Sequence, residues 1–263
     1  MGVKVAVQIA ESLKAEELKP ADLTIDEILK IIDNFVKATL RAREAGFDAV
    51  EFHAAHHYTL ADFISKKTNT RRDNFGKNFE GRMKILLEII AKSKEKVGND
   101  YTIICRINGD EFIVGGNTLK DAQFIAKRLE EIGIHAIDVS CNGKWDEGID
   151  AYSANRICPT KEWPNGANIH LSEGIKKVVR IPVIGGGLIS HPEIAETILE
   201  ENKCDLVYLG RPLFRDPYWP IKAKEGRWGE ILECKFCNFC LKLLRSNKKV
   251  ECKYRSKGRQ NTN

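Results

Sequence analysis

The strongest constraint on the fold is a unit that recurs along the chain: a helix end, a glycine and then an apolar strand. AGFDAVEF at 45–52 and IGIHAIDV at 132–139 share this unit, and ENKCDLVYL at 201–209 is a looser copy with Asn202 near the cap position. Glycine ends helices because it adopts the left-handed conformation without steric cost. Apolar strands that alternate with helices predict a parallel sheet covered by helices.

The unit and its flanking patterns predict six strands and four longer helices. The first helix begins at Thr24, which forms a Thr-x-x-Glu capping box with Glu27, and ends at Gly46. The expected strands lie at 3–9, 49–53, 101–107, 136–140, 182–185 and 205–209, and the other helices at 79–97, 118–132 and 192–200. Two closures fit this order: an open doubly wound sheet, which is complete with six strands, and a (β/α)8 barrel, which needs two more.

The residues at the strand ends favour the barrel. Arg106 ends one strand, a triplet from Gly185 to Gly187 ends the next-to-last, and Gly210 and Arg211 end the last. Barrels place their chemistry at the C-terminal ends of the strands and bind phosphate after the last two. The triplet alone is equally typical of a tight turn. Two successive glycine ends followed by an arginine instead predict a phosphate site of backbone N–H groups and one guanidinium.

A second polar group follows the strand at 49–53. His53, His56, His57 and Tyr58 lie within six residues, before the charged segment NTRRDNFGKNFEGR at 69–82. Imidazole and phenol groups stabilise an oxyanion and transfer protons near neutral pH. The pattern indicates a catalytic strand end followed by a loop of fixed shape, although a partly exposed polar strand end fits it too.

Composition indicates a soluble globular protein. The 263 residues are 43% hydrophobic and 30% charged, with a formal net charge of +5. No apolar run is long enough to span a membrane and no secretory signal is visible, so we expect a cytoplasmic protein. Basic residues are frequent after the last strand, and we interpret residues 255–263 as a disordered, solvated tail rather than a nucleic-acid-binding surface.

The eight cysteines divide into a scattered and a clustered set. In a cytosolic protein they indicate metal ligands or buried thiols rather than disulfides. Four of them have the spacing C-x2-C-x2-C-x11-C: Cys234, Cys237, Cys240 and Cys252. This spacing suits either a tetrahedral zinc or an iron–sulfur cluster, and three cysteines at two-residue intervals are more typical of the cluster-binding run of ferredoxins.

These motifs together resemble the old yellow enzyme family of flavin-dependent ene-reductases. The resemblance covers about residues 3–252 and is strongest to the iron–sulfur branch that includes 2,4-dienoyl-CoA reductase and trimethylamine dehydrogenase. The segments that carry it are VEFHAAHHY, NTRRDNFGKNFEGR, Gly187, LGRPLFRDP and the four cysteines. The chain differs at Phe75, Lys77, Asn78 and Gly81, positions that shape the loop in the family.

The resemblance implies a TIM-type (β/α) barrel with FMN on its C-terminal face. It places Gln8 at the pyrimidine edge of the flavin and Arg106 against flavin N1, where a cation stabilises the reduced ring. It also implies a 4Fe-4S cluster that passes electrons to the flavin. The residues it assigns to the flavin phosphate are Gly186, Gly187, Gly210 and Arg211, and those it assigns to the cluster are Cys234, Cys237, Cys240 and Cys252.

The resemblance also assigns the substrate side. His53 and His56 would bind the carbonyl oxygen of an unsaturated substrate, and Tyr58 would protonate one alkene carbon while flavin N5 delivers hydride to the other. The loop at 144–147, KWDE, would help to select the substrate. The implied electron donor is NADH, NADPH or a reduced carrier such as ferredoxin. The particular alkene and the oligomeric state are open.

The chain departs from the family pattern in three ways. Leu188 stands where the family has an arginine, and two strands that precede the first strand in the family have no counterpart. No G-x-G-x-x-G fingerprint follows the last cysteine, so we expect FAD and NAD(P)H only if further C-terminal domains exist. We therefore expect a truncated barrel at 1–230 and a cysteine segment at 231–254, which together bind FMN weakly or not at all.

Two other functions fit parts of the sequence. One is a flavin-free, phosphate-binding barrel lyase or isomerase that uses the His/Tyr group for acid–base catalysis and holds a structural zinc. The other is a non-enzymatic zinc module whose basic tail binds nucleic acid, which would leave the strand-end residues unexplained.

Overall fold

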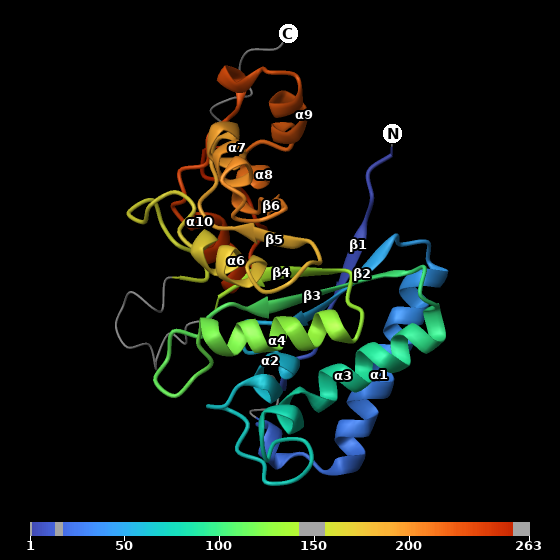
Figure 1. Ribbon diagram of the computed structural model, residues 1–263. Helices are drawn as coiled ribbons and strands as arrows, with labels where there is room; N and C mark the ends of the chain where they lie inside the picture. The colour runs from blue at the N-terminus through green and yellow to red at the C-terminus, as the bar shows by residue number, and fades with distance from the viewer. Residues whose placement is uncertain (1, 14–17, 142–155, 255–263) are drawn as a thin grey trace.

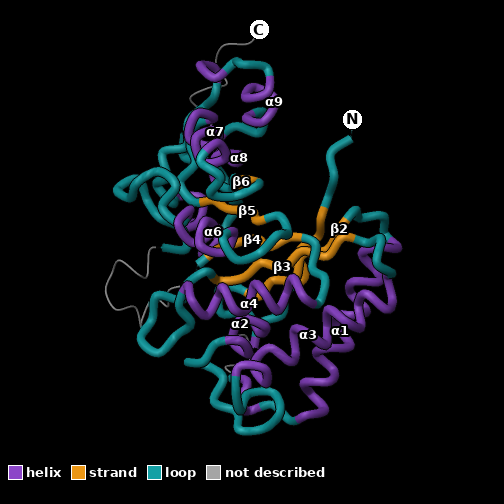
Figure 2. The backbone as a smooth tube through the Cα atoms, in the orientation of Figure 1, coloured by secondary structure: helices purple, strands orange, loops and turns teal. Residues whose placement is uncertain are grey.

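The computed structural model describes residues 2–13, 18–141 and 156–254 and contains a single six-stranded parallel sheet. The strands pair in the order in which they occur in the chain (Figures 1 and 2). They are β1 (Ala6–Ile9), β2 (Ala49–Ala54), β3 (Thr102–Asn108), β4 (Ala136–Ser140), β5 (Val183–Gly186) and β6 (Leu206–Tyr208). All five pairs are parallel.

This strand order distinguishes between the two predicted closures. A doubly wound sheet reverses its strand order at a switch point, whereas a barrel adds each strand beside the previous one. The sheet here runs from β1 to β6 without reversal and curls into a half-barrel (Figure 1). The predicted barrel-type α/β fold with six visible strands is confirmed.

The helices that alternate with these strands begin and end close to the predicted positions. Thr24 forms the predicted capping box with Glu27, and Gly46, Gly98 and Gly133 have φ values of 83°, 73° and 84° at the helix ends. These left-handed positions explain why glycine ends these three helices. The helices are α1 (Ile25–Glu44), α3 (Phe79–Val97), α4 (Leu119–Glu131) and α7 (Pro192–Glu200).

Several shorter elements were not predicted from the sequence. A 3-10 turn, η2 (Pro20–Asp22), precedes α1, and a second, η3 (Trp228–Glu230), precedes the cysteine segment. The short helices are α2 (Thr59–Ile64), α6 (Ile169–Lys176), α8 (Arg211–Arg215), α9 (Trp219–Lys224) and α10 (Phe239–Arg245). Helices of five to eight residues depend on tertiary packing rather than on their own propensity.

The first strand is also shorter than predicted, because it begins at Ala6 rather than at Val3. Val3 and Val5 are exposed, and among the strands of the described residues only β2 pairs with β1. A strand at a sheet edge keeps its regular structure only where its one neighbour reaches, and here pairing starts at Ala6 and Ala49.

The sheet has one apolar face and one face that carries polar groups. Phe52, Ile103 and Ile137 belong to the larger buried cluster, which also contains residues of α1, α3 and α4. Side chains alternate between the two faces of a strand. The residues immediately before and after each of these three therefore point to the opposite face, on the inner side of the curled sheet. A second buried cluster joins Ile169, Ala195, Cys204 and Trp219 around β5 and β6.

No helix within the described part of the chain is both long and apolar enough to cross a bilayer. The loop at 144–147 and the tail at 255–263 lie outside the described residues.

Candidate functional site

A row of charged and polar side chains crosses the inner side of the sheet. His53 of β2 is in register with Arg106 of β3, which is in register with Asp138 of β4. The Nη1 atom of Arg106 lies 3.3 Å from Oδ2 of Asp138, and its guanidinium carbon lies 5.0 Å from the ring centroid of Tyr208. The half-barrel therefore holds Arg106 between a carboxylate and an aromatic ring.

The surroundings of this row alter the pKa values of its members. Burial, reinforced by the charge of Arg106, lowers the pKa of His53 to about 4. Burial raises the pKa of Asp138 to about 7, against the opposing effect of Arg106. His53 is therefore neutral near pH 7, and its imidazole has one N–H to donate. Burial lowers the pKa of Arg106, but nearby groups led by Asp138 outweigh it, so the net direction is upward and Arg106 stays cationic.

The predicted catalytic group forms one cluster at the end of β2. The ring centroids of His53 and Tyr58 are 4.4 Å apart, and Nε2 of His53 lies 3.3 Å from Nδ1 of His56. Nε2 of His56 lies 2.7 Å from the hydroxyl oxygen of Ser140, and its backbone N–H donates to the side-chain oxygen of Asn108 over 3.2 Å. The ends of β2, β3 and β4 thus fix the position of His56 together.

The backbone turns sharply between these catalytic candidates. His56 and His57 have φ values of 59° and 56°, a left-handed conformation that is uncommon for residues other than glycine. His57 is buried, and its Nδ1 lies 2.9 Å from Oδ1 of Asp62, which anchors the turn to α2. Strained conformations of this kind persist where surrounding contacts hold them, and they cluster at functional sites.

The segment at 69–82, for which the sequence predicts a fixed shape, is held by several side-chain hydrogen bonds. The side-chain amide of Asn69 donates to the carbonyl oxygens of Phe63 and Phe75, over 2.7 and 2.8 Å. Arg71 pairs with Asp73 and also donates to the carbonyl oxygens of Pro20 and Leu23. The segment therefore supports α2, which follows the predicted catalytic group.

Three of the four predicted phosphate residues line a cavity of about 480 Å³ at the ends of β5 and β6. Gly187, Gly210 and Arg211 line one part of it, and Arg106 and Tyr208 line another. Gly187 has φ of 116°, which favours glycine. Leu188 lines the same cavity, so the arginine that the family resemblance expects there is replaced by an apolar side chain.

Two of the predicted flavin residues lie apart from this cavity. Gly186 packs against Tyr208, because a Cβ atom added there would lie 2.5 Å from the tyrosine ring. Gln8 is exposed on β1, and its side-chain amide donates to Oε1 of Glu51 over 2.5 Å. The structure therefore brings together Arg106, Gly187, Gly210 and Arg211, and leaves Gln8 at the far edge of the sheet.

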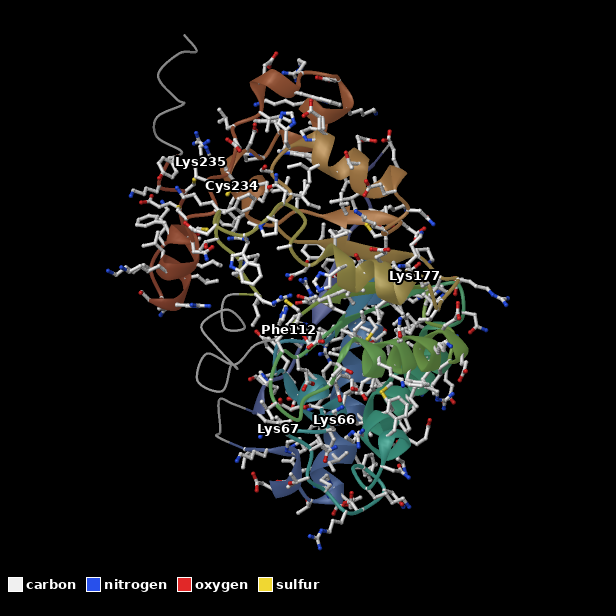
Figure 3. All side chains as sticks on the ribbon, turned by 60° about the vertical axis from the view of Figure 1, so that its left-hand side comes forward. Lys66, Lys67, Phe112, Lys177, Cys234 and Lys235 are labelled. Atoms are coloured by element: carbon white, nitrogen blue, oxygen red, sulfur yellow. The ribbon has the colours of Figure 1, made fainter. Side chains whose placement is uncertain are left out.

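The four clustered cysteines belong to one segment at the end of the described chain. Cys237 is exposed, the other three are partly buried, and none of the four forms a disulfide. Figure 3 shows Cys234 in the upper part of the molecule and Lys66 and Lys67 in the lower part. Among the described residues, no three potential ligands come close enough to hold a metal ion. Four free thiols of one segment fit an iron–sulfur cluster or zinc by donor chemistry, and such ligands commonly gather only when the metal binds.

Among the scattered cysteines, Cys105, Cys141 and Cys204 are buried, as predicted for structural thiols, whereas Cys158 is partly buried. Burial raises the pKa of Cys158, and Arg211 and Cys240 are among the groups whose charges act on it. Cys158 also lines the 480 Å³ cavity.

Sequence reasoning missed Asn108, Asp138, Ser140 and Asn168. The first three lie at or near the end of a strand. The same position identified Arg106 as a candidate, so it was the signal that could have identified these three residues as well. Asn168 lines the cavity, and its buried Oδ1 accepts no hydrogen bond from any described residue. It precedes α6, a helix that the sequence did not predict, so no pattern marked it.

Known proteins are similar to this chain over most of its length. The model of the NADH:flavin oxidoreductase / NADH oxidase family matches residues 3–230. The NADH oxidase of Thermoanaerobacter brockii is 48% identical over 220 residues, which cover 84% of this chain and 33% of that protein. A metal reductase of Desulforamulus reducens is 39% identical over 234 residues, covering 89% of this chain and 34% of the relative. The chain thus spans about one third of the length of these curated relatives.

Solved structures show the same fold. A 2-naphthoyl-CoA reductase in complex with 2-naphthoyl-CoA has a TM-score of 0.81 at 29% identity, covering 88% of this chain and 34% of that chain. An old yellow enzyme homologue from Zymomonas mobilis has a TM-score of 0.60 at 26% identity, covering 78% and 54%. With the family match over most of its length, the chain belongs to the NADH:flavin oxidoreductase / NADH oxidase family.

Proposed function

We propose that this chain forms the FMN-binding and catalytic part of an oxidoreductase that reduces a carbonyl-conjugated alkene with electrons from NAD(P)H or a reduced carrier. One observation carries the proposal: a single cavity joins Arg106 at the centre of the sheet to Gly187, Gly210 and Arg211 at the ends of β5 and β6. An FMN molecule has a ring that becomes anionic on reduction and a distant phosphate, so it requires cationic groups at two separated places.

The fit of FMN to this cavity rests on three features. Its volume of about 480 Å³ lies within the usual range for ligand sites, roughly 300–1,000 Å³. Gly210 has open space where a side chain would begin, so a phosphate can approach the backbone. The unpaired, buried Oδ1 of Asn168 is an acceptor that a hydroxyl group of the ligand could satisfy.

Arg106 supplies the electrostatic part of the chemistry. When bound, FMN supplies the hydride and accepts the replacement electrons. Arg106 is held in place by Asp138 and Tyr208 and remains positively charged, so it stabilises negative charge near the pyrimidine edge without reorganisation.

The cluster at the end of β2 supplies the substrate side. Neutral His53, together with His56, donates hydrogen bonds to the carbonyl oxygen of the substrate, which makes the conjugated double bond electron-poor. Tyr58 lies beside His53. It provides the proton for the alkene carbon that does not receive the hydride. When the substrate binds, the two imidazoles would give up their contact of 3.3 Å with each other. Each would then donate a hydrogen bond to the substrate oxygen instead.

The names of similar proteins support this substrate class. One solved relative is a reductase in complex with 2-naphthoyl-CoA, a thioester conjugated to an aromatic ring, and curated relatives include an NADH oxidase and NADPH dehydrogenases. We propose a conjugated carbonyl compound as substrate and a 4Fe-4S cluster on Cys234, Cys237, Cys240 and Cys252 as the electron entry point. We also propose a division into a barrel at 1–230 and a cysteine segment at 231–254.

Anaerobic purification followed by visible absorption spectroscopy and metal analysis tests the proposal. Yellow-brown protein with iron, sulfide and flavin supports it, and the flavin stoichiometry tests the predicted weak binding. Colourless protein without iron, even after reconstitution with FMN and with iron and sulfide, would refute it. Such protein would favour the flavin-free lyase or isomerase, in which the same His/Tyr cluster acts as an acid–base catalyst.

A further inference from the structure

Arg211 is held by two residues that lie between the clustered cysteines. The guanidinium carbon of Arg211 lies 4.7 Å from the ring centroid of Phe236, and its Nη1 donates to Oδ1 of Asn238 over 2.5 Å. Phe236 lies between Cys234 and Cys237, and Asn238 lies between Cys237 and Cys240. Each two-residue interval of the cysteine run thus provides one contact to the predicted phosphate-binding arginine.

The orientation of the Asn238 amide follows from its partners. Its Nδ2 donates to the carbonyl oxygen of Cys158 over 2.8 Å, while its Oδ1 accepts from Arg211. A guanidinium only donates and a carbonyl oxygen only accepts, so the amide cannot be reversed without losing both bonds. Asn238 therefore joins the cysteine run, the strand-connecting loop at Cys158 and Arg211 in one network.

These bonds occupy only part of the Arg211 guanidinium. Nη1 also donates to the carbonyl oxygen of Pro159 over 2.7 Å. Nε and Nη2 bond to no other described residue, and Arg211 lines the 480 Å³ cavity. A guanidinium held at one nitrogen presents the other two as a planar pair, which is the arrangement that binds phosphate through two parallel hydrogen bonds.

The contacts to Arg211 depend on the path of the backbone between the cysteines. Phe236 and Asn238 have φ values of 46° and 55°, so both are left-handed. The N–H of Phe236 donates to the sulfur of Cys234 over 3.4 Å. A movement that gathers the cysteine sulfurs therefore also moves the two side chains that hold Arg211.

We propose that Phe236 and Asn238 are positioning residues that couple metal binding by the cysteine run to phosphate binding by Arg211. The coupling rests on the proposed function, because it requires that the chain bind both the metal and FMN. Metal ligation fixes the backbone of the run, and the fixed run restricts Arg211 to the orientation that receives the phosphate. By thermodynamic reciprocity, bound FMN strengthens metal binding by the same factor.

Flavin titrations test the coupling. The whole chain is prepared anaerobically in an iron–sulfur-loaded and a metal-free form, and binding of FMN and of riboflavin is followed by flavin fluorescence. We expect metal loading to tighten FMN binding about tenfold, within the range of known couplings, and to change riboflavin binding less than about twofold. Equal tightening of both ligands, or of neither, would overturn the coupling, because riboflavin lacks the phosphate.

Two matched variants locate the effect. Asn238→Gly keeps a left-handed backbone without strain and removes both side-chain bonds, so the loaded and metal-free forms should bind FMN with nearly equal affinity. Asn247→Gly changes another left-handed asparagine, with φ of 50°, just after α10. Asn247 provides none of the hydrogen bonds or ring contacts to Arg211 described above, so this variant should keep the tenfold ratio. A tenfold ratio in Asn238→Gly would overturn the role of Asn238. Failure of both flavins to bind either form of the wild-type chain would instead refute the proposed function itself.

Discussion

Gly186→Ala provides a direct test of how the half-barrel holds Arg106. A Cβ atom at position 186 would lie 2.5 Å from Cε2 and Cζ of Tyr208 and 2.7 Å from Cδ2. Real Cβ atoms do not approach a ring so closely, so the ring of Tyr208 must move. That ring also packs over the guanidinium of Arg106, at 5.0 Å from ring centroid to guanidinium carbon.

The expected cost combines two effects. Forcing an extra methyl group into a packed site typically costs about 1–3 kcal/mol. Loss of the contact between Arg106 and Tyr208 accounts for about 0.5–2 kcal/mol of such a change. We therefore expect the free energy of unfolding to fall by about 2 kcal/mol, which for a chain of this size corresponds to roughly 4–8 °C in Tm.

Urea denaturation followed by circular dichroism measures this difference, with Gly229→Ala as a control. A Cβ atom at position 229 meets nothing within 4 Å, so this variant should unfold within about 0.5 kcal/mol of the wild type. Tyr208→Val removes the ring, and adding Gly186→Ala in that background should then cost little. An undiminished cost in the Tyr208→Val background would refute the steric argument.

Three further predictions concern the catalytic cluster, a buried carboxyl group and a helix cap. In a full-length relative, the substitution equivalent to Tyr58→Phe should leave flavin reduction by NAD(P)H unchanged and slow reduction of a conjugated alkene by about 10²–10⁴-fold in stopped-flow measurements, because it removes the proposed proton donor; equal loss in both steps would refute the role. Burial raises the pKa of Glu111 to about 7, so the folded state binds this proton more tightly than the unfolded state. Its contribution to stability, roughly 3 kcal/mol, is present below about pH 4.5 and is lost as the pH rises through 7. Glu111→Gln should therefore flatten the fall in unfolding free energy between pH 5 and 8, and an unchanged slope would contradict the assignment. Thr24→Ala breaks the capping box at the start of α1 and should lower the unfolding free energy by about 1 kcal/mol in urea, whereas a cost near zero would show that the box contributes nothing.

The positions of the strands were predictable because local signals encode them. Each glycine that ends a helix requires a left-handed backbone, and the strand that follows is mostly apolar, so Gly46 and Gly133 mark strand starts without any tertiary information. The short helices were not predictable in this way. α6 and α8 are too short to be stable alone and form only where the sheet already provides a surface.

The candidate site was predictable where an uncommon residue type occurs at the end of a strand. His53, His56 and Tyr58 cluster as expected, and Arg106, Gly187, Gly210 and Arg211 share one cavity. Asn108 and Ser140 were missed because an amide or a hydroxyl at a strand end is common and acquires meaning only when His56 lies beside it. The link from Asn238 to Arg211 joins residues 27 positions apart through side-chain geometry, which sequence spacing does not encode.

The division of the core into two clusters has a consequence for how the chain unfolds. The larger cluster joins β1 to β5 with α1, α3 and α4, whereas the smaller one gathers α7, α9 and the start of β6. Segments with separate cores open as separate cooperative units, and a smaller core opens at lower free energy. Native-state hydrogen exchange should therefore show amide protons of α7 exchanging well before those of α3. The part of the chain that carries Arg211 would then open transiently, while the amide protons around the histidine cluster remain protected from exchange.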